Sequence, residues 1–420
     1  MVNPIKTILA LVLLTAQGAV AAGPDFDQGR IDIPSMNIRP SSEKAGSLWV
    51  TLDRGEVATV SASNLFAQEP IRVSGSEAMY EVSESQLLGL SSFMHDTFNR
   101  CGGFFAYRTR AEAEADLAAK ATVNSGPYTV NQKAVVASLV AKVQEAGIRS
   151  TIETLAAFNN RFFTSETGVE AATWLQGRWQ ALAGNIPGAT TQLFKHQGWR
   201  QPSVILTIPG VEKPDEIVVL GGHLDSINGM ERSNASRAPG ADDNASGIAV
   251  LTEAVRVLGT SGLRPSRTIQ FMGYAAEEVG LRGSQDIAKQ AAKDGKKVVA
   301  VIQYDMTNFR GAGESIYLLD DNVDPKLTAF LGTLIETYAG VPWSTTRCGY
   351  GCSDHASWTR NGFPASAAFE STFEGMNHAL HTVRDTLATT GGTAQHSVAF
   401  AKLAVAFAVE IAKTAVPATK

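Results

Sequence analysis

Imidazole and carboxylate side chains recur at the ends of apolar segments in the second half of the chain. They are His223 and Asp225 after Ile217–Leu220, Glu277 and Glu278 after Arg267–Met272, Asp305 after Val298–Gln303, and His381 much later. One at a time they indicate little, because a histidine after a strand is usually structural and two adjacent glutamates usually lie in a solvated turn. As a group they indicate a site, since open α/β sheets bind ligands outside the carboxyl ends of their strands.

The loop at residues 239–247 adds further carboxylates between the first two of these segments. It reads PGADDNASG, and its Asp242, Asp243 and Asn244 are on their own ordinary capping residues for the helix that follows. Imidazole and carboxylate together, with no thiolate of the ligand type, suit zinc or a similar divalent ion. Five such ligands are more than one tetrahedral zinc uses, and an odd carboxylate can bridge two ions, as in many hydrolases.

Strands and helices alternate from residue 203 onward, and these elements must position the side chains. We expect strands at Ser203–Ile208, Glu216–Gly221, Arg267–Met272, Val298–Gln303, Ser315–Leu319 and Pro364–Phe369, and helices at Ala245–Leu258, Leu281–Ala292, Leu327–Tyr338, Asp354–Arg360 and Gln395–Ala412. Uninterrupted apolar strands suit a sheet that is covered on both faces. The alternation predicts a three-layer α/β domain with a doubly wound, mostly parallel sheet and helices on both faces.

Residues 23–122 differ from this region and hold no comparable group of ligands or nucleophiles. Short strands at 47–52 and 102–107 and helices at 84–97 and 110–121 predict a small α+β unit. The turn-forming sequence at 124–127, NSGP, marks its boundary. We therefore divide the chain into a signal peptide (1–22), this N-terminal unit (23–122), the α/β domain (123–415) and a tail (416–420).

The first 22 residues are typical of a secretory signal peptide, with Lys6, an apolar run at 8–14 and Ala19-Val20-Ala21 at the cleavage position. A transmembrane anchor is the alternative, but the apolar stretch is shorter than the roughly 20 residues that a span needs. The 420 residues have an ordinary globular composition, and their net charge of −5 argues against nucleic-acid binding. We expect an exported protein with no nucleic-acid partner and, after signal removal, no membrane partner.

Six sequence blocks occur in order across the α/β region. They are GHLDS (222–226), PGADDNASG (239–247), YAAEEVGLRGS (274–284), DMTN (305–308), CGYGCSDHASW (348–358) and HTVRDTL (381–387). With these blocks, residues 130–412 resemble the secreted bacterial leucyl aminopeptidases, which are zinc exopeptidases with two co-catalytic metal ions. The resemblance implies the zinc exopeptidase fold, and it implies that residues 23–122 are a prosegment that assists folding and blocks the site until it is removed.

The resemblance also implies a ligand set. Asp243 would bridge two zinc ions, with His223 and Asp305 completing one and Glu278 and His381 completing the other. Each zinc would then have one imidazole, one terminal carboxylate and a share of the bridge, which leaves room for a water. Two cations lower the pKa of that water and stabilise the charge of a tetrahedral intermediate.

Three further roles near the ligands follow from the same resemblance. Glu277 would act first as the general base and then as the general acid. Asp225 would accept a hydrogen bond from His223 and fix its tautomer. The peptide bond between Asp243 and Asn244 would be cis.

The block at 348–358 contributes a hydroxyl and a pair of cysteines. The Tyr350 hydroxyl would donate to the scissile carbonyl oxygen, with simple loop packing as the alternative. Ser353 would support the ligands or cap a helix. Cys348 and Cys352 would form a small disulfide, which leaves Cys101 over; two free thiols or a zinc knuckle are the alternatives.

An apolar pocket would receive the first side chain of the substrate. Met306, Phe369 and Phe373 are its candidate lining residues, and each is equally suited to plain core packing. The resulting hypothesis is a secreted, monomeric metallo-aminopeptidase with two Zn²⁺ that acts on peptides with a free N-terminus and prefers leucine or another large apolar residue. The alternatives are a one-zinc glutaminyl cyclase of the same fold, a related carboxypeptidase, and a metal-free binding protein. The complete ligand set and Glu277 disfavour the first and the last of these. The short spacing between Glu278 and His381 leaves no room for the inserted domain of many carboxypeptidases.

Overall fold

The computed structural model describes residues 47–63, 65, 70–75, 77–98, 102–118, 122–123, 125–229 and 233–414. The predicted signal peptide, the tail at 416–420 and Cys101 lie outside the described residues. These described residues belong to one compact unit. No helix within the described ranges is long and apolar enough to cross a membrane.

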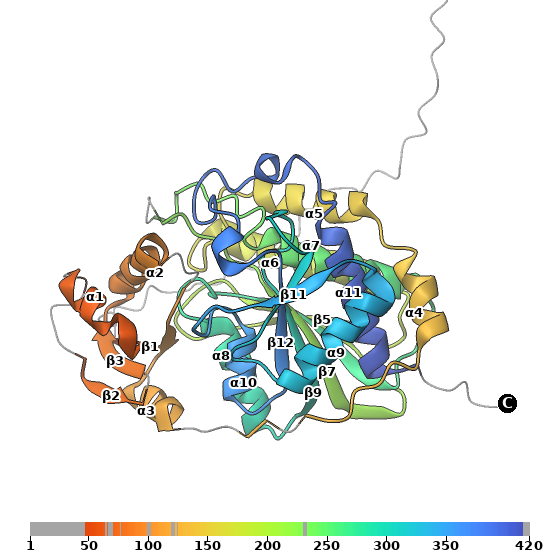
Figure 1. The fold of residues 1–420 in the computed structure, drawn as a ribbon, viewed down its shortest axis with the longest axis horizontal. Helices are drawn as coiled ribbons and strands as arrows, with labels where there is room; N and C mark the ends of the chain where they lie inside the picture. The colour runs from red at the N-terminus through yellow and green to blue at the C-terminus, as the bar shows by residue number, and fades with distance from the viewer. Residues whose placement is uncertain are drawn as a thin grey trace, which may run out of the picture. The chain divides into compact units, whose positions relative to one another are not determined.

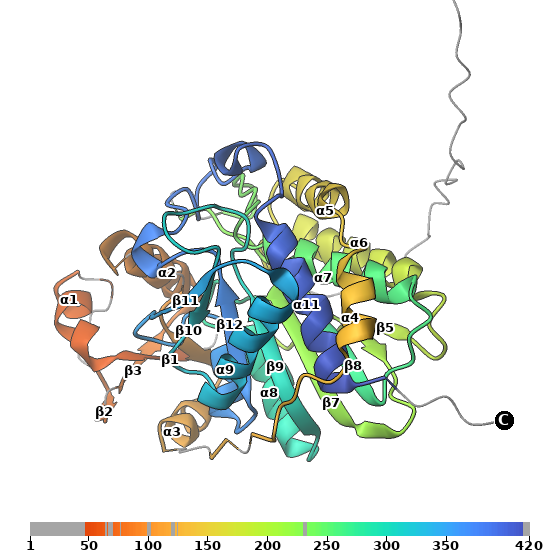
Figure 2. The same ribbon diagram turned by 45° about the vertical axis from the view of Figure 1, so that its right-hand side comes forward.

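An eight-stranded sheet forms the centre of the larger domain, with the strand order β11-β10-β12-β9-β7-β8-β6-β5 (Figures 1 and 2). The strands are β5 (Thr190–Phe194), β6 (Ser203–Ile208), β7 (Lys213–His223), β8 (Arg267–Tyr274), β9 (Lys297–Tyr304), β10 (Ile316–Leu319), β11 (Trp343–Thr346) and β12 (Ala365–Phe369). The four central strands, β12, β9, β7 and β8, run parallel to one another. The β10/β12, β6/β8 and β5/β6 pairs are antiparallel, so the sheet is mixed.

Helices cover both faces of this sheet, as the alternation predicts (Figures 1 and 2). They are α4 (Lys133–Val140), α5 (Glu145–Ala157), α6 (Glu166–Ala183), α7 (Ala245–Gly259), α8 (Arg282–Lys293), α9 (Pro325–Leu334), α10 (His355–Arg360) and α11 (Ser397–Ala412). Val218 and Leu220 of β7 pack into one core with α7 and α11, whereas Val219 packs into the other core with α8 and α10. Alternate strand residues therefore fill the two cores, which confirms the open α/β fold.

Some elements of the structure were not predicted from the sequence. The outer strands β5 and β11 are partly exposed and short of apolar residues, so their sequences lack the buried-strand pattern. The predicted helix at 327–338 consists of α9, which is capped by Asp324, followed by a π-helical turn at Ile335–Ala339. Strands β6, β10 and β11 run opposite to the central strands, so the sheet is less parallel than expected.

The described part of the N-terminal unit is an α+β structure, as expected. Its four-stranded antiparallel sheet has the order β2-β3-β1-β4. Its elements are β1 (Leu48–Asp53), α1 (Val57–Ala62), β2 (Arg72–Ser74), β3 (Glu77–Val82), α2 (Glu84–Phe98), β4 (Phe105–Tyr107) and α3 (Arg110–Ala118). Val50, Tyr80, Leu90 and Met94 belong to a core of its own.

Candidate metal centre

The candidate ligands meet at the carboxyl ends of three neighbouring parallel strands. His223 is the last residue of β7, Glu278 lies in the loop after β8, and Asp305 directly follows β9. Asp243 precedes the residue that caps α7. His381 comes from the long loop between β12 and α11. Five segments that are far apart in the sequence are therefore brought to one edge of the sheet.

The five residues form two groups that share one member. His223, Asp243 and Asp305 can each offer a ligand atom within 4.8 Å of the others, and so can Asp243, Glu278 and His381. Nε2 of His223 lies 3.0 Å from Oδ1 of Asp243 and 3.2 Å from Oδ1 of Asp305. Nε2 of His381 lies 3.1 Å from Oδ2 of Asp243 and 2.8 Å from Oε2 of Glu278. Each oxygen of Asp243 thus faces a different histidine.

The donor set fits a pair of divalent cations. Asp243, Glu277 and Glu278 are each at most 2% exposed, and within the described part of the chain none of their carboxylate oxygens makes a hydrogen bond. Burying a charge is costly unless its lone pairs are satisfied, so buried carboxylates are normally hydrogen-bonded or coordinate a metal. The two groups of candidate ligands share the Asp243 carboxylate, so together they can coordinate two ions.

Burial and mutual charge shift the pKa values in this centre. Burial opposes charge on His223, but Asp305 and Glu277 outweigh it and raise the pKa of His223 well above its ordinary value. Burial would raise the pKa of Asp243, but its contacts with His223 and His381 lower it overall. Burial and the neighbouring Asp243 raise the pKa of Glu278 to about 7. Such a centre exchanges protons for divalent cations, because ligands must be deprotonated to bind a metal.

Glu277 stands beside the ligand groups without belonging to them. Its Oε2 lies 3.9 Å from Nε2 of His223. Burial raises its pKa well above the ordinary value. A buried carboxyl group whose pKa is raised is suited to accept and return a proton.

Asp225 and Ser353 support the centre in different ways. The Asp225 carboxylate accepts hydrogen bonds from the amides of Glu277 (3.0 Å) and Glu278 (3.2 Å). Nδ1 of His223 lies 3.1 Å from the main-chain oxygen of Asp225 and 3.6 Å from its carboxylate, so the expected contact runs mainly through the main chain. Ser353 donates to Oδ2 of Asp305 at 2.5 Å.

Unusual backbone conformations cluster around these ligands. Ala276, Met306 and His381 have φ angles of 57°, 56° and 55°, and the peptide bond between Asp243 and Asn244 is cis, as the resemblance implies. Residues other than glycine adopt positive φ at a cost and do so mainly where the surrounding structure enforces it, often at functional sites. Ala276 precedes the Glu277–Glu278 pair, Met306 follows Asp305, and His381 is itself a candidate ligand.

Comparison with known proteins agrees with this geometry. The profile that defines Peptidase family M28 matches residues 203–406, the span that contains all five candidate ligands. A Trichophyton verrucosum protein named "Probable leucine aminopeptidase" is 40% identical over 324 residues, which cover 76% of this chain and 87% of the relative. The chain belongs to peptidase family M28. It is therefore a hydrolase of the peptidase class.

Two solved structures share the architecture of this M28 peptidase. LapB of Legionella pneumophila is 31% identical with a TM-score of 0.76, over 87% of this chain and 100% of that one. The LapA aminopeptidase of the same organism is 27% identical with a TM-score of 0.75, over 88% and 99% of the two chains. Both likenesses confirm the fold.

The predicted pocket residues lie together in the M28 chain. Met306, Phe369 and Phe373 line a cavity of about 20 Å³ that also borders Asp305. Cys348 and Cys352, which are joined by a disulfide, form another part of its wall. The Tyr350 ring packs edge-on against Phe373, with the centroids 6.1 Å apart, and it also lines a larger cavity of about 460 Å³ shared with the N-terminal unit.

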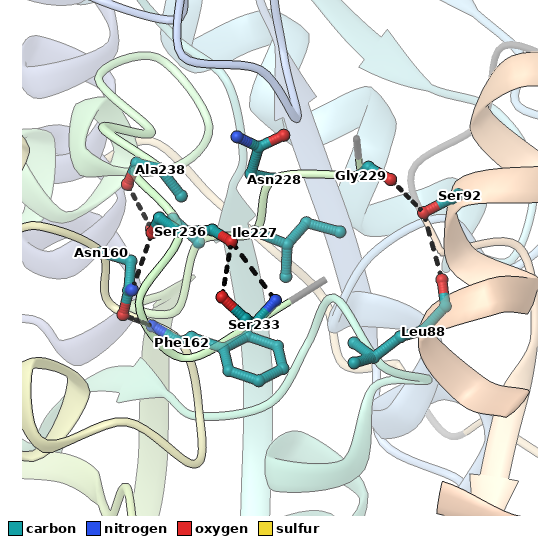
Figure 3. Close-up of a pocket in the computed structure, with 11 residues that line it drawn as sticks. Leu88, Ser92, Asn160, Phe162, Ile227, Asn228, Gly229, Ser233, Ser236 and Ala238 are labelled. Atoms are coloured by element: carbon teal, nitrogen blue, oxygen red, sulfur yellow. Dashed lines mark hydrogen bonds between the residues drawn. The ribbon is translucent and has the colours of Figure 1, made fainter. Parts of the chain in front are cut away.

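Helix α2 of the N-terminal unit lies against the loop that follows β7. The Ser92 hydroxyl lies within hydrogen-bond distance of the main-chain oxygens of Leu88 (3.1 Å) and Gly229 (3.0 Å) and can donate to either, and a small pocket remains between this helix and the loop (Figure 3). Three residues further along α2, the His95 ring lies 4.9 Å from the ring of His381. The N-terminal unit therefore reaches the candidate metal centre.

Sequence reasoning assigned no role of their own at the centre to four buried ionisable residues. The carboxyl groups of Asp242, Glu370 and Asp385 are buried in a cluster beside Asp243, and Arg161 is fully buried nearby. Glu370 directly follows β12, so the rule that identified the ligands applies to it as well. Asp385 stands in the last of the six blocks. Arg161 has no comparable signal, because its partners are main-chain oxygens.

Proposed function

We propose that this M28 peptidase is a secreted two-zinc aminopeptidase that removes leucine or another large apolar residue from the N-terminus of peptides. The observation that carries the proposal is Asp243, whose two carboxylate oxygens face two separate ligand groups. The M28 membership and a relative named leucine aminopeptidase support the same reaction class. The alternative, a one-zinc glutaminyl cyclase, would not require a carboxylate shared between two metal ions.

The residues divide the work of peptide-bond hydrolysis. Two zinc ions bound by these ligands would activate a water and polarise the scissile carbonyl. Glu277 takes the proton from the water and returns it to the leaving amine, since it is buried and its Oε2 lies 3.9 Å from Nε2 of the candidate ligand His223. Asp225 holds the Glu277 and Glu278 amides, so the base and the ligand beside it keep a fixed relative position. In this proposal, Tyr350 donates to the developing oxyanion.

The apolar cavity beside Asp305 receives the first side chain of the substrate. Its volume of about 20 Å³ has room for about one water molecule. A leucine side chain therefore enters only if the lining residues move. Of Met306, Phe369 and Phe373, only Phe373 is partly exposed, so it is the one best able to move. An apolar pocket of this kind discriminates single methylene groups by about 1–3 kcal/mol, so the preference is graded.

The N-terminal unit acts as an inhibitory prosegment in this proposal. The His95 ring stands beside the candidate ligand His381, which supports a blocked site. Charged pairs hold the unit in place: Arg108 pairs with Asp286 at 2.8 Å, Arg282 with Glu84 at 2.5 Å, and Arg360 with both Glu77 and Asp116. Export through residues 1–22 and removal of the unit by proteolysis complete the proposed maturation. The N-terminus of the secreted active form, read by mass spectrometry, tests this step, and an active form that starts at residue 22 or 23 contradicts it.

One experiment tests the catalytic proposal directly. The purified processed protein is analysed for zinc per chain and assayed on leucyl p-nitroanilide before and after dialysis against a chelator. We expect about two zinc ions per chain, loss of hydrolysis after dialysis, and recovery with added zinc. Hydrolysis that continues after complete metal removal overturns the two-zinc mechanism.

A further inference from the structure

The main chain that carries Asp243 is held from two sides by buried charged side chains. The segment Pro239–Asp243 leads into α7, and its backbone carbonyls and amides point to different partners. The partners are Arg161, from the loop between α5 and α6, and Asp385, from the loop that also carries His381. Arg161 is 0% exposed and Asp385 is 1% exposed.

Arg161 binds the first half of this segment. Its Nη1 donates to the Pro239 oxygen at 2.6 Å, and its Nη2 donates to the Gly240 oxygen at 2.8 Å. Nε donates to the oxygen of Leu224, which follows His223, at 2.8 Å. The same guanidinium group therefore connects the backbone next to one ligand with the backbone that leads to another. The approach is close, because a Cβ on Gly240 would lie 2.7 Å from Nη2.

Asp385 binds the second half of the segment. Its Oδ1 accepts from the Asp242 amide at 3.1 Å, and its Oδ2 accepts from the Asp243 amide at 3.0 Å. Its main-chain oxygen accepts from the Ala241 amide at 3.1 Å. Since Asp385 is four residues from His381, these bonds also fix the spacing between two candidate ligands.

We infer that Arg161 and Asp385 are positioning residues that together hold Pro239–Asp243 so that the Asp243 carboxylate reaches both metal positions. Hydrogen bonds with a charged partner are about twice as strong as neutral ones. Here a guanidinium group binds the carbonyls and a carboxyl group binds the amides of successive residues. A bridging carboxylate must face two ions at once, and supporting contacts of ligands commonly change metal affinity 10–100-fold. The inference rests on the proposed two-zinc function.

Two conservative substitutions test it. Asp385→Asn keeps the shape but turns one amide acceptor into a donor, and Arg161→Lys keeps the charge but loses the forked geometry. The matched controls are Asp324→Asn and Arg237→Lys. Asp324 is a buried carboxylate that accepts from the Leu327 amide at 2.7 Å, far along the chain at the start of α9. Arg237 donates to main-chain oxygens at the end of α5, including that of Ala156 at 2.7 Å.

The first readout is zinc per chain in dialysis against a series of buffered free-zinc concentrations. We expect both variants to bind the weaker of the two zinc ions 10–100-fold less tightly, with both controls within about threefold of the wild type. The second readout is amide hydrogen exchange of the metal-free proteins, where Ala241, Asp242 and Asp243 should exchange at least tenfold faster in Asp385→Asn. Absorption of the cobalt-substituted proteins reports whether the ligand geometry has changed.

The outcomes separate this inference from the proposed function. Unchanged zinc affinity together with unchanged exchange at Ala241–Asp243 overturns the positioning role. A wild type that binds fewer than two zinc ions overturns the proposed function instead. In that case, faster amide exchange in metal-free Asp385→Asn still shows that Asp385 holds the main chain of Ala241–Asp243. If Asp385→Asn does not fold, Arg161→Lys decides by the same measurements, and equal behaviour of Arg161→Lys and Arg237→Lys overturns the inference.

Discussion

Replacing Arg360 with methionine should release the N-terminal unit from the metal centre in the unprocessed chain. Arg360 ends α10, and its side chain is 21% exposed. It pairs with Glu77 and Asp116, whose side chains are 26% and 11% exposed, and its guanidinium carbon lies 3.6 Å from the centre of the Phe105 ring. All three partners belong to the N-terminal unit, so this one side chain anchors β3, β4 and α3.

The size of the effect follows from these contacts. A hydrogen bond with a charged group contributes about 1.5–3 kcal/mol, and the partial exposure of both pairs favours the lower end. Two pairs therefore contribute about 3 kcal/mol. The thioether of methionine keeps some of the packing against Phe105, so the aromatic contact adds little to the loss. Because about 1.4 kcal/mol corresponds to a factor of ten, the population with the N-terminal unit displaced should rise about 100-fold.

The assay is hydrolysis of leucyl p-nitroanilide by the unprocessed chain, with its intact mass checked by mass spectrometry. If the unit blocks the site, Arg360→Met raises the activity of the unprocessed chain up to about 100-fold and leaves the processed enzyme unchanged. Arg149→Met is the control, since Arg149 pairs only with Glu145 and Glu153 of α5 among the described residues. A variant with a lower melting temperature but the same activity as the unprocessed wild type refutes the reasoning, because the unit would then be docked without blocking.

Three further predictions concern the base, the pocket and an ion pair distant from the site. Glu277→Gln should lower kcat about 10²–10⁴-fold while zinc per chain stays at the wild-type value; loss of zinc in this variant would show that Glu277 is a ligand instead. Phe373→Ala should change the ratio of kcat/KM for leucyl and phenylalanyl p-nitroanilides by about tenfold in favour of the larger residue, and an unchanged ratio would place the pocket elsewhere. Lys297 and Arg267 hold the pKa of Glu216 at about 2, so its stabilisation is present above pH 4.5 and is lost as the pH falls toward 2. In urea unfolding, Glu216→Gln should therefore be about 1 kcal/mol less stable than the wild type at pH 7 and equally stable near pH 2, and a constant difference across this range contradicts the assignment.

A short-range rule points to three of the five candidate ligands, whereas Asp243, His381 and the choice of Glu278 over Glu277 came from the family resemblance. His223, Glu278 and Asp305 come at the ends of apolar strands, and parallel neighbours bring those ends together. The outer strands could not be found in this way, since β5 and β11 are only partly buried and lack the apolar pattern. The direction of an edge strand is decided by the connection that precedes it, and the local sequence does not encode it.

Arg161 and Asp385 could not be found for a different reason. Besides the nearby oxygen of Leu155, the Arg161 side chain binds main-chain oxygens that lie 63, 78 and 79 positions away in the sequence, and the Asp385 carboxyl group binds amides 142 and 143 positions away. Apart from the Asn377 side chain, which donates to Asp385 at 3.4 Å, these partners are main-chain atoms, which every residue has, so no pattern of side-chain types predicts the pairing. Only the fold determines which carbonyls and amides come within reach of a buried charge.

Two glycines in the loops that build the site also contact the N-terminal unit. Gly280 stands in the block that carries Glu277 and Glu278, and its φ of 98° already favours glycine. A Cβ there would also lie 2.7 Å from the Cβ of Ala106 and 2.8 Å from its nitrogen, which donates to the Gly280 oxygen. Gly351, in the disulfide loop beside Tyr350, has the Phe105 ring 2.6 Å from its ideal Cβ position. Strand β4 thus packs against glycines in two of the loops that build the site. A side chain at either position would displace the N-terminal unit, and at Gly280 it would also strain the loop.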